Sequence, residues 1–156
     1  MTTAQKPAYL GVLNNISLAE SCAGRALKVW ASQTADPRVR EVLELVTARE
    51  EEHGLSFARR IEELRYSLIE RDVPGLNLAE EETFLSSDRP DLEKLRHLYP
   101  ADRPDLTGFL DRLLQGYDYD PETRALMERY VAEEKDSGQR LRALLSELEE
   151  AASARS

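Results

Sequence analysis

The segment VTAREEEHGLSF, residues 46–57, places a Glu-x-x-His pair inside a helical hydrophobic pattern. Side chains recurring every three or four positions form the stripe that an amphipathic helix turns toward a core. The stripe consists of Val39, Val42, Val46, Glu50, His53, Phe57, Ile61, Leu64 and Leu68. Glu50 and His53 therefore face the core, whereas Glu51 and Glu52 can reach water. Because an unpartnered buried carboxylate costs several kcal/mol, this pair needs a charge partner, a proton or a metal ion.

The composition is that of a helical protein with one domain. The chain has 156 residues, 33% of them charged and 6% aromatic, which predicts a single all-α domain over residues 1–156. The net charge of −9 argues against nucleic acid and anionic membranes as partners, because both bind basic faces. Cys22 is the single cysteine, so no disulfide framework or cysteine-rich metal site is expected. With neither a signal-peptide pattern nor an apolar run of about 18 residues, a cytoplasmic location without membrane contact is expected.

Helix signals divide the chain into two hairpins and a crossover. Asp-Pro at residues 36–37 and 120–121 suits a helix start, because Asp caps the first turn and Pro needs no N–H there. The pentapeptide DRPDL, at residues 88–92 and 102–106, predicts two further starts. Four bundle helices are expected at about 8–34, 37–70, 105–117 and 121–151, the third of them short or broken, with further short helices at 78–85 and 91–99. The predicted units are hairpin 8–70, irregular crossover 71–104 and hairpin 105–151.

Two more glutamates interrupt apolar stripes. Glu20 lies in the first predicted helix and Glu134 in the last, each about as far from its hairpin turn as Glu50 is. Antiparallel packing would bring them to a similar height, so Glu20, Glu50, His53 and Glu134 are the candidate metal ligands. At about 4 Å and an effective dielectric near 20, each carboxylate pair repels by roughly 4 kcal/mol. A metal cation, protonation or an arginine partner would each relieve that repulsion.

The second hairpin repeats the first incompletely. The offset that carries residues 36–37 onto 120–121 also carries Glu50 onto Glu134. It carries His53 onto Ser137 and Glu20 onto Pro104. The second hairpin therefore keeps one of the three polar core groups, and any site between the hairpins would be lopsided.

A glutamate on the first helix followed by Glu-x-x-His on the second resembles the ferritin-like superfamily, and rubrerythrin-type proteins most of all, over about residues 10–148. The resemblance implies an antiparallel four-helix bundle binding iron or manganese ions that react with dioxygen or peroxide. It implies that Glu20 and His53 are terminal ligands and that Glu50 and Glu134 are bridges.

This sequence departs from the rubrerythrin-type pattern in the second hairpin. Ser137 stands where the second histidine is expected, and Pro104 where a third-helix glutamate is expected, with Asp105 beside it. One ion is therefore favoured over two, with Asp105 an open candidate for a weak second position. Rubredoxin-like cysteine pairs are missing, so an external electron donor is expected for any redox activity.

Two functions from different classes follow from these features. The first is a ferritin-like metal-binding protein with iron- or manganese-dependent oxidoreductase activity on dioxygen or peroxide. The alternative is a non-catalytic ferritin-like bundle acting as a dimeric structural or interaction protein, with a cage-forming iron store as a weaker third. A homodimer is expected because Leu43, Leu45 and Leu55, off the main stripe, predict an apolar outer face. Whether residues 76–104 cover the site stays open.

Overall fold

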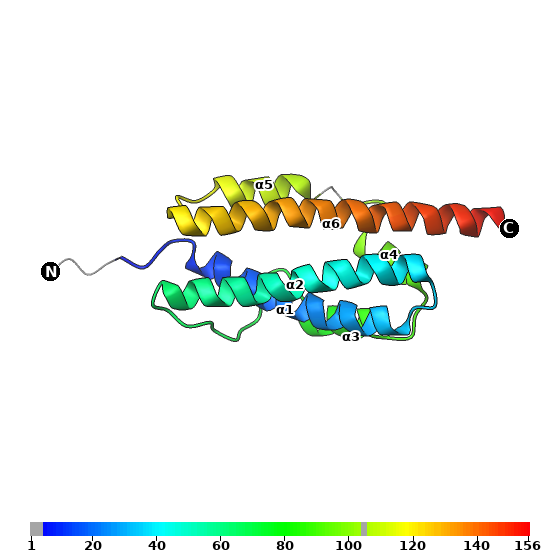
Figure 1. Ribbon diagram of the computed structural model, residues 1–156, viewed down its shortest axis with the longest axis horizontal. Helices are drawn as coiled ribbons and strands as arrows, with labels where there is room; N and C mark the ends of the chain where they lie inside the picture. The colour runs from blue at the N-terminus through cyan, green and yellow to red at the C-terminus, as the bar shows by residue number, and fades with distance from the viewer. Residues whose placement is uncertain (1–4, 104–105) are drawn as a thin grey trace.

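The computed structural model describes residues 5–103 and 106–156, and the described part is all-helical, without strands (Figure 1). The helices are α1 (Leu10–Gln33), α2 (Pro37–Glu63), α3 (Leu78–Leu85), α4 (Asp91–Leu98), α5 (Thr107–Gln115) and α6 (Pro121–Ala154). None of them is both long and apolar enough to cross a membrane. The all-helical prediction and all six predicted helices are thus confirmed, with differences at some helix ends.

The helix starts follow the predicted capping chemistry. Asp36 accepts a hydrogen bond from the backbone N–H of Arg38 at the start of α2, and Asp120 accepts one from Thr123 at the start of α6. Each cap satisfies one of the backbone N–H groups that a helix start leaves without a partner. The first DRPDL copy also starts a helix, with Pro90 at the cap of α4. Residues 104 and 105 of the second copy lie outside the described residues.

The second helix is shorter than predicted, because it ends at Glu63 rather than near residue 70. Arg65 follows with a φ of 72°, which turns the chain out of the helix. Asn14 of α1 then binds both backbone groups of Ile69 in the segment that follows. Its side-chain amide donates to the Ile69 carbonyl at 3.0 Å and accepts from the Ile69 N–H at 2.7 Å. These two tertiary bonds satisfy backbone groups that further helix would have paired internally.

Three long helices form the body of the molecule. Antiparallel α1 and α2 pack along each other, and α6 lies alongside α2 (Figure 1). The short α5 packs against the N-terminal part of α6 and contains no fully buried residue. Toward the other end, α3 packs on α1 and α4 on α6. The crossover therefore contributes walls to the body instead of merely linking two hairpins.

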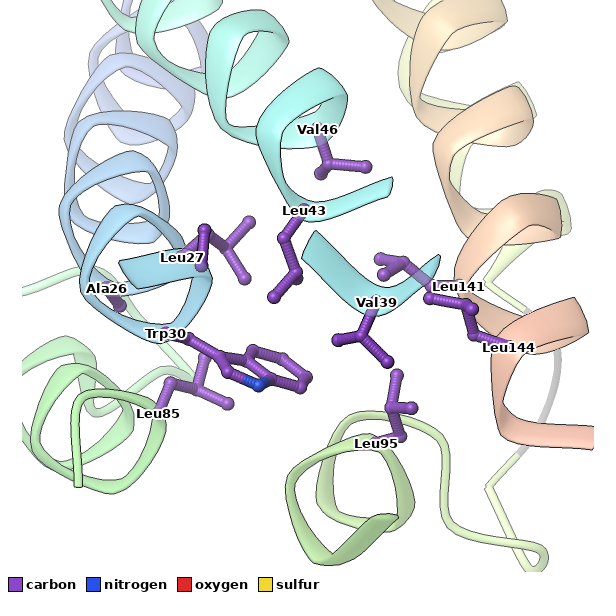
Figure 2. Close-up of a cluster of buried hydrophobic side chains, with 11 residues drawn as sticks. Ala26, Leu27, Trp30, Val39, Leu43, Val46, Leu85, Leu95, Leu141 and Leu144 are labelled. Atoms are coloured by element: carbon purple, nitrogen blue, oxygen red, sulfur yellow. The ribbon is translucent and has the colours of Figure 1, made fainter. Parts of the chain in front are cut away.

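The buried apolar side chains form two separate cores. The α3–α4 core, drawn in Figure 2, consists of Ala26, Leu27, Trp30, Ala31, Val39, Leu43, Val46, Leu85, Leu95, Leu141 and Leu144. The α5 core, toward the other end, consists of Tyr9, Leu10, Leu13, Ile16, Phe57, Ile61, Tyr119, Met127, Tyr130 and Val131. Along α1, α2 and α6 the residues between these two sets include the predicted ligands.

The predicted apolar outer face is wrong in one of its three members. Leu43 is 0% exposed and belongs to the α3–α4 core, whereas Leu45 and Leu55 are exposed. Leu43 is covered because α4 and the C-terminal part of α6 pack over that face of α2, placing Leu95 and Leu141 in the same core (Figure 2).

Candidate metal centre

The four predicted ligands meet between the two cores. One ligand atom from each of Glu20, Glu50, His53 and Glu134 lies within 4.8 Å of those of the other three. We refer to these four residues as the inner cluster. Glu20 and Glu50 are 5% and 6% exposed and His53 is 0% exposed, while Glu134 is partly buried. The helical periodicity therefore assigned the inward faces of α1, α2 and α6 correctly.

Small residues let α1 and α2 approach closely at this level. A Cβ on Gly54 would overlap the side chain and backbone of Ser21, and a Cβ on Gly24 would lie 2.9 Å from the Glu51 side chain. The Ser17 hydroxyl also donates to the Gly54 carbonyl at 2.8 Å. Since Gly54 follows His53 directly, this contact sets the imidazole against α1.

Several buried polar atoms of the inner cluster make no hydrogen bond within the described chain. These atoms are Glu20 Oε1, Glu134 Oε1 and both ring nitrogens of His53. His53 Nδ1 lies 3.3 Å from Glu20 Oε1 and 3.6 Å from Glu134 Oε1. Buried polar groups in native proteins are paired in the great majority of cases, so the three atoms that face one another, Glu20 Oε1, Glu134 Oε1 and His53 Nδ1, indicate a missing binding partner.

No lysine or arginine among the residues described forms an ion pair with the three inner carboxylates; the ion pairs of Glu20 and Glu134 are with His53. The nearest candidate by sequence, Arg49, instead donates to Asp136 at 2.7 Å and to Ser137 at 3.0 Å. The arginine-partner explanation is therefore wrong for this cluster, which leaves protons or a cation.

Burial and mutual repulsion raise the carboxyl pKa values. Burial first, and the Glu134 charge after it, raise the pKa of Glu20 to about 8. Burial and the Glu50 charge raise the pKa of Glu134 to about 8, and burial and Glu20 raise the pKa of Glu50 well above its usual range. Three adjacent carboxyl groups that hold their protons at neutral pH can exchange those protons for a metal cation.

No family model matches this chain. No curated protein and no solved structure matches it either. The chemical interpretation of the site therefore depends on its own geometry and charge.

A second acidic group shares the same histidine. Glu52, His53 and Glu133, here called the outer group, also place ligand atoms within 4.8 Å of one another. Its carboxylates already have a cation, because Arg129 donates to Glu52 at 2.8 Å and to Glu133 at 3.0 Å. Helical periodicity does not single out Glu133, because Glu133 lies off the α6 stripe; its adjacency to Glu134 was the available signal.

Glu133 lies where it can orient the imidazole. Its Oε1 is 3.5 Å from His53 Nε2, while His53 Nδ1 faces the inner carboxylates. Metal-ligating histidines commonly donate their second ring N–H to a carboxylate, which fixes the tautomer. His53 can thus present the Nδ1 lone pair to the inner cluster and the Nε2 proton to Glu133.

The inner cluster has the size and donors for one ion. Ligands about 2.0–2.2 Å from a common ion stand at most about 4.4 Å apart, so the 4.8 Å spread needs only a small contraction. Three carboxylates and one imidazole suit iron, manganese or zinc. On the second hairpin, Ser137 is buried and hydrogen-bonded to Arg49, so the counterpart of His53 adds no donor to the cluster.

Proposed function

We propose that this protein is a ferritin-like metal-binding bundle that holds one iron or manganese ion on Glu20, Glu50, His53 and Glu134, with oxidoreductase activity on dioxygen or peroxide. The observation that carries the proposal is the convergence of buried, unpartnered carboxylate and imidazole atoms with no basic side chain to neutralise them. A bound ion would supply the redox chemistry at this site.

The charge of the donor set supports a redox metal over a purely structural one. Glu20, Glu50 and Glu134 contribute three negative charges when ionised, which balance a trivalent ion and leave a divalent ion with one excess negative charge. The set therefore stabilises the higher oxidation state of iron or manganese. Zinc, which has no redox chemistry, gains nothing from the third carboxylate.

The surrounding residues hold the imidazole of His53 in place. Tyr130 packs its ring edge against His53, with ring centroids 5.1 Å apart, and contacts Phe57 in the same way. Glu133 takes the other side of the imidazole. These contacts restrict His53 to one orientation, which a preorganised ligand requires.

Metal titration tests the proposal, with the two histidines of the chain as a matched pair. Purified protein is stripped with chelator, titrated with Fe(II) or Mn(II), and followed by metal content, melting temperature and metal-dependent consumption of peroxide. We expect near-stoichiometric binding that His53→Gln abolishes. His97→Gln is the control, because His97 is exposed and pairs with Glu81. Metal binding that survives His53→Gln and Glu50→Gln, or none in the unsubstituted protein, would overturn the proposal.

The competing function is a non-catalytic bundle that forms a homodimer. It is favoured by the Arg49–Ser137 hydrogen bond at the counterpart of His53 and by Leu55, which is 70% exposed on α2. Light scattering of protein with and without metal separates the two functions. A dimer that binds no metal supports this alternative, and a monomeric mass contradicts it.

A further inference from the structure

A cavity of about 240 Å³ lies against the inner cluster, between α1, α2, α3, α6 and the C-terminal end of α4. Glu20, Glu50 and Glu134 line one part of it, while Glu81 and Glu82 of α3 line another. The side chains of Glu81 and Glu82 are 43% and 34% exposed, in contrast to the buried Glu20 and Glu50. The cavity thus leads from solvent at α3 to the inner carboxylates, and the crossover forms its outer wall.

The walls between these two ends are apolar. Leu27, Val46, Leu85, Leu98 and Leu141 line them, and the described lining residues include no lysine or arginine. A charged group held against these apolar walls would lose its hydration without gaining a counterion there. An anion would in addition meet the three carboxylates at the inner end.

Glu81 and Glu82 at the entrance are not free to bind a cation, because each already has a partner. The Glu82 carboxylate accepts from Arg25 at 3.1 Å, and Glu81 pairs with His97 at 2.7 Å. The polar groups that remain are of the neutral hydrogen-bonding kind, such as the Tyr99 phenol, whose pKa burial raises to about 12. They suit a hydroxyl or carbonyl on an otherwise apolar molecule.

The volume sets the size of the occupant. An apolar cavity of about 150 Å³ is enough to bind benzene. About 240 Å³ therefore accommodates a substituted benzene or a small bicyclic compound, and is far larger than dioxygen or peroxide require.

We propose that this cavity binds an uncharged, mainly apolar organic molecule of about the size of a substituted benzene, held against Leu27, Leu98 and Leu141 beside the inner cluster. The inference extends the proposed function. It rests on that function only where it names this molecule as the class of substrate. Binding itself needs the cavity walls and no metal.

Toluene and indole serve as neutral probes, with benzoate as a charged counterpart of similar size. Binding is followed by NMR chemical shifts in both chelator-treated and metal-loaded protein. Two substitutions fill the cavity from different helices: Ala23→Leu on α1 and Gly138→Leu on α6. A Cβ on Gly138 meets only the Tyr99 hydroxyl, at 4.0 Å, and leucine favours a helix more than glycine does. Ala48→Leu, on the exposed face of α2, is the matched control.

We expect the neutral probes to bind, benzoate to bind at least about tenfold more weakly, and each filling substitution to weaken toluene binding at least about tenfold with no change for Ala48→Leu. Circular dichroism checks that each variant is folded. The proposal is overturned if no neutral probe binds up to its solubility limit, if both filling variants bind toluene as the parent does, or if benzoate binds more tightly than toluene. Probe binding in protein that takes up no metal would refute the metal function alone, and metal uptake without probe binding would refute the cavity assignment alone.

Discussion

The inner cluster and the outer group share His53 but balance their charge in different ways. In the outer group, Arg129 neutralises Glu52 and Glu133, and Glu52 and Arg129 are nearly half exposed. In the inner cluster, three carboxylates lie within reach of one another with only an imidazole beside them. Acidic residues close together are therefore not sufficient to indicate a metal site. The inner cluster is buried without a basic partner and therefore requires a cation or protons. The charges of the outer group are already neutralised by Arg129.

The largest expected difference between the two sets is in the pH dependence of stability. Glu20 and Glu134 have folded-state pKa values of about 8 against 4.5 ordinarily, so the folded state holds their protons more tightly than the unfolded state does. In metal-free protein, the stability that these two groups contribute is fully present below pH 4.5 and is lost as the pH rises through about 8. For one such group the shift corresponds to about 5 kcal/mol, and the interacting groups do not simply add.

Urea unfolding across that pH range, with chelator and then with saturating Mn(II), measures the effect. Metal should remove most of the loss at the alkaline end, since the ion takes the place of the protons. A flat profile in metal-free protein would contradict the buried-carboxyl interpretation.

The second-largest difference between the inner cluster and the outer group is expected in metal affinity. Glu50→Gln removes an inner ligand and is expected to weaken Mn(II) binding by at least about 100-fold, more than the loss of an outer-shell group causes. Glu52→Gln, two positions along the same helix, should change it by less than about fivefold, because Glu52 makes an exposed ion pair with Arg129. Competition with a chromophoric chelator gives both constants. A larger loss for Glu52→Gln than for Glu50→Gln would place the metal in the outer group.

Glu133 belongs to the outer group but acts on the inner cluster through His53. Glu133→Ala is expected to weaken metal binding about tenfold, and Glu133→Gln should restore part of it, because an amide oxygen at the place of Glu133 Oε1, 3.5 Å from Nε2, is also able to accept the ring N–H. Glu128→Ala, exposed on the same helix, controls for the lost charge. The NMR chemical shifts of the His53 ring give a second measurement, which would stay unchanged if Glu133 had a purely structural role. Loss of affinity without partial rescue by Gln would indicate that Glu133 acts by charge alone.

The smallest effect should follow from Arg129→Gln. Arg129 and Glu52 are 45% and 47% exposed at the side chain, so their pair contributes at most about 1 kcal/mol to the free energy of unfolding. Thermal unfolding in low and high salt measures it, and added salt should shrink the difference. A loss of several kcal/mol would mean that the outer group is structurally as important as the inner cluster.

The sequence predicted the inner cluster because one regular property, helical periodicity, determines which way Glu20, Glu50, His53 and Glu134 face. Each lies in a long helix whose start is marked by capping residues or a clear apolar stripe. The end of α2 was not predictable in the same way, since its pattern continues past Glu63. It is Asn14, distant in sequence, that binds Ile69 and holds the segment out of the helix.

The packing of the crossover helices could not be predicted from a single sequence, for a related reason. Two short helices, α3 and α4, have few buried residues, and periodicity does not reveal which longer helix each one covers. Leu43 was therefore expected at the surface, and the cavity between α1, α3 and α6 was not foreseen. Glu133 escaped notice because its importance comes from the far side of the His53 ring and not from its own stripe.

The separation of the buried apolar side chains into two cores bears on how the molecule opens. Each long helix is anchored in both cores but passes between them through a level where the side chains repel rather than attract. Amide hydrogen exchange would then report two cooperative units, with the α5 end, where α5 has no fully buried residue, opening before the end closed by α3 and α4. An ion held jointly by α1, α2 and α6 would join those units into one.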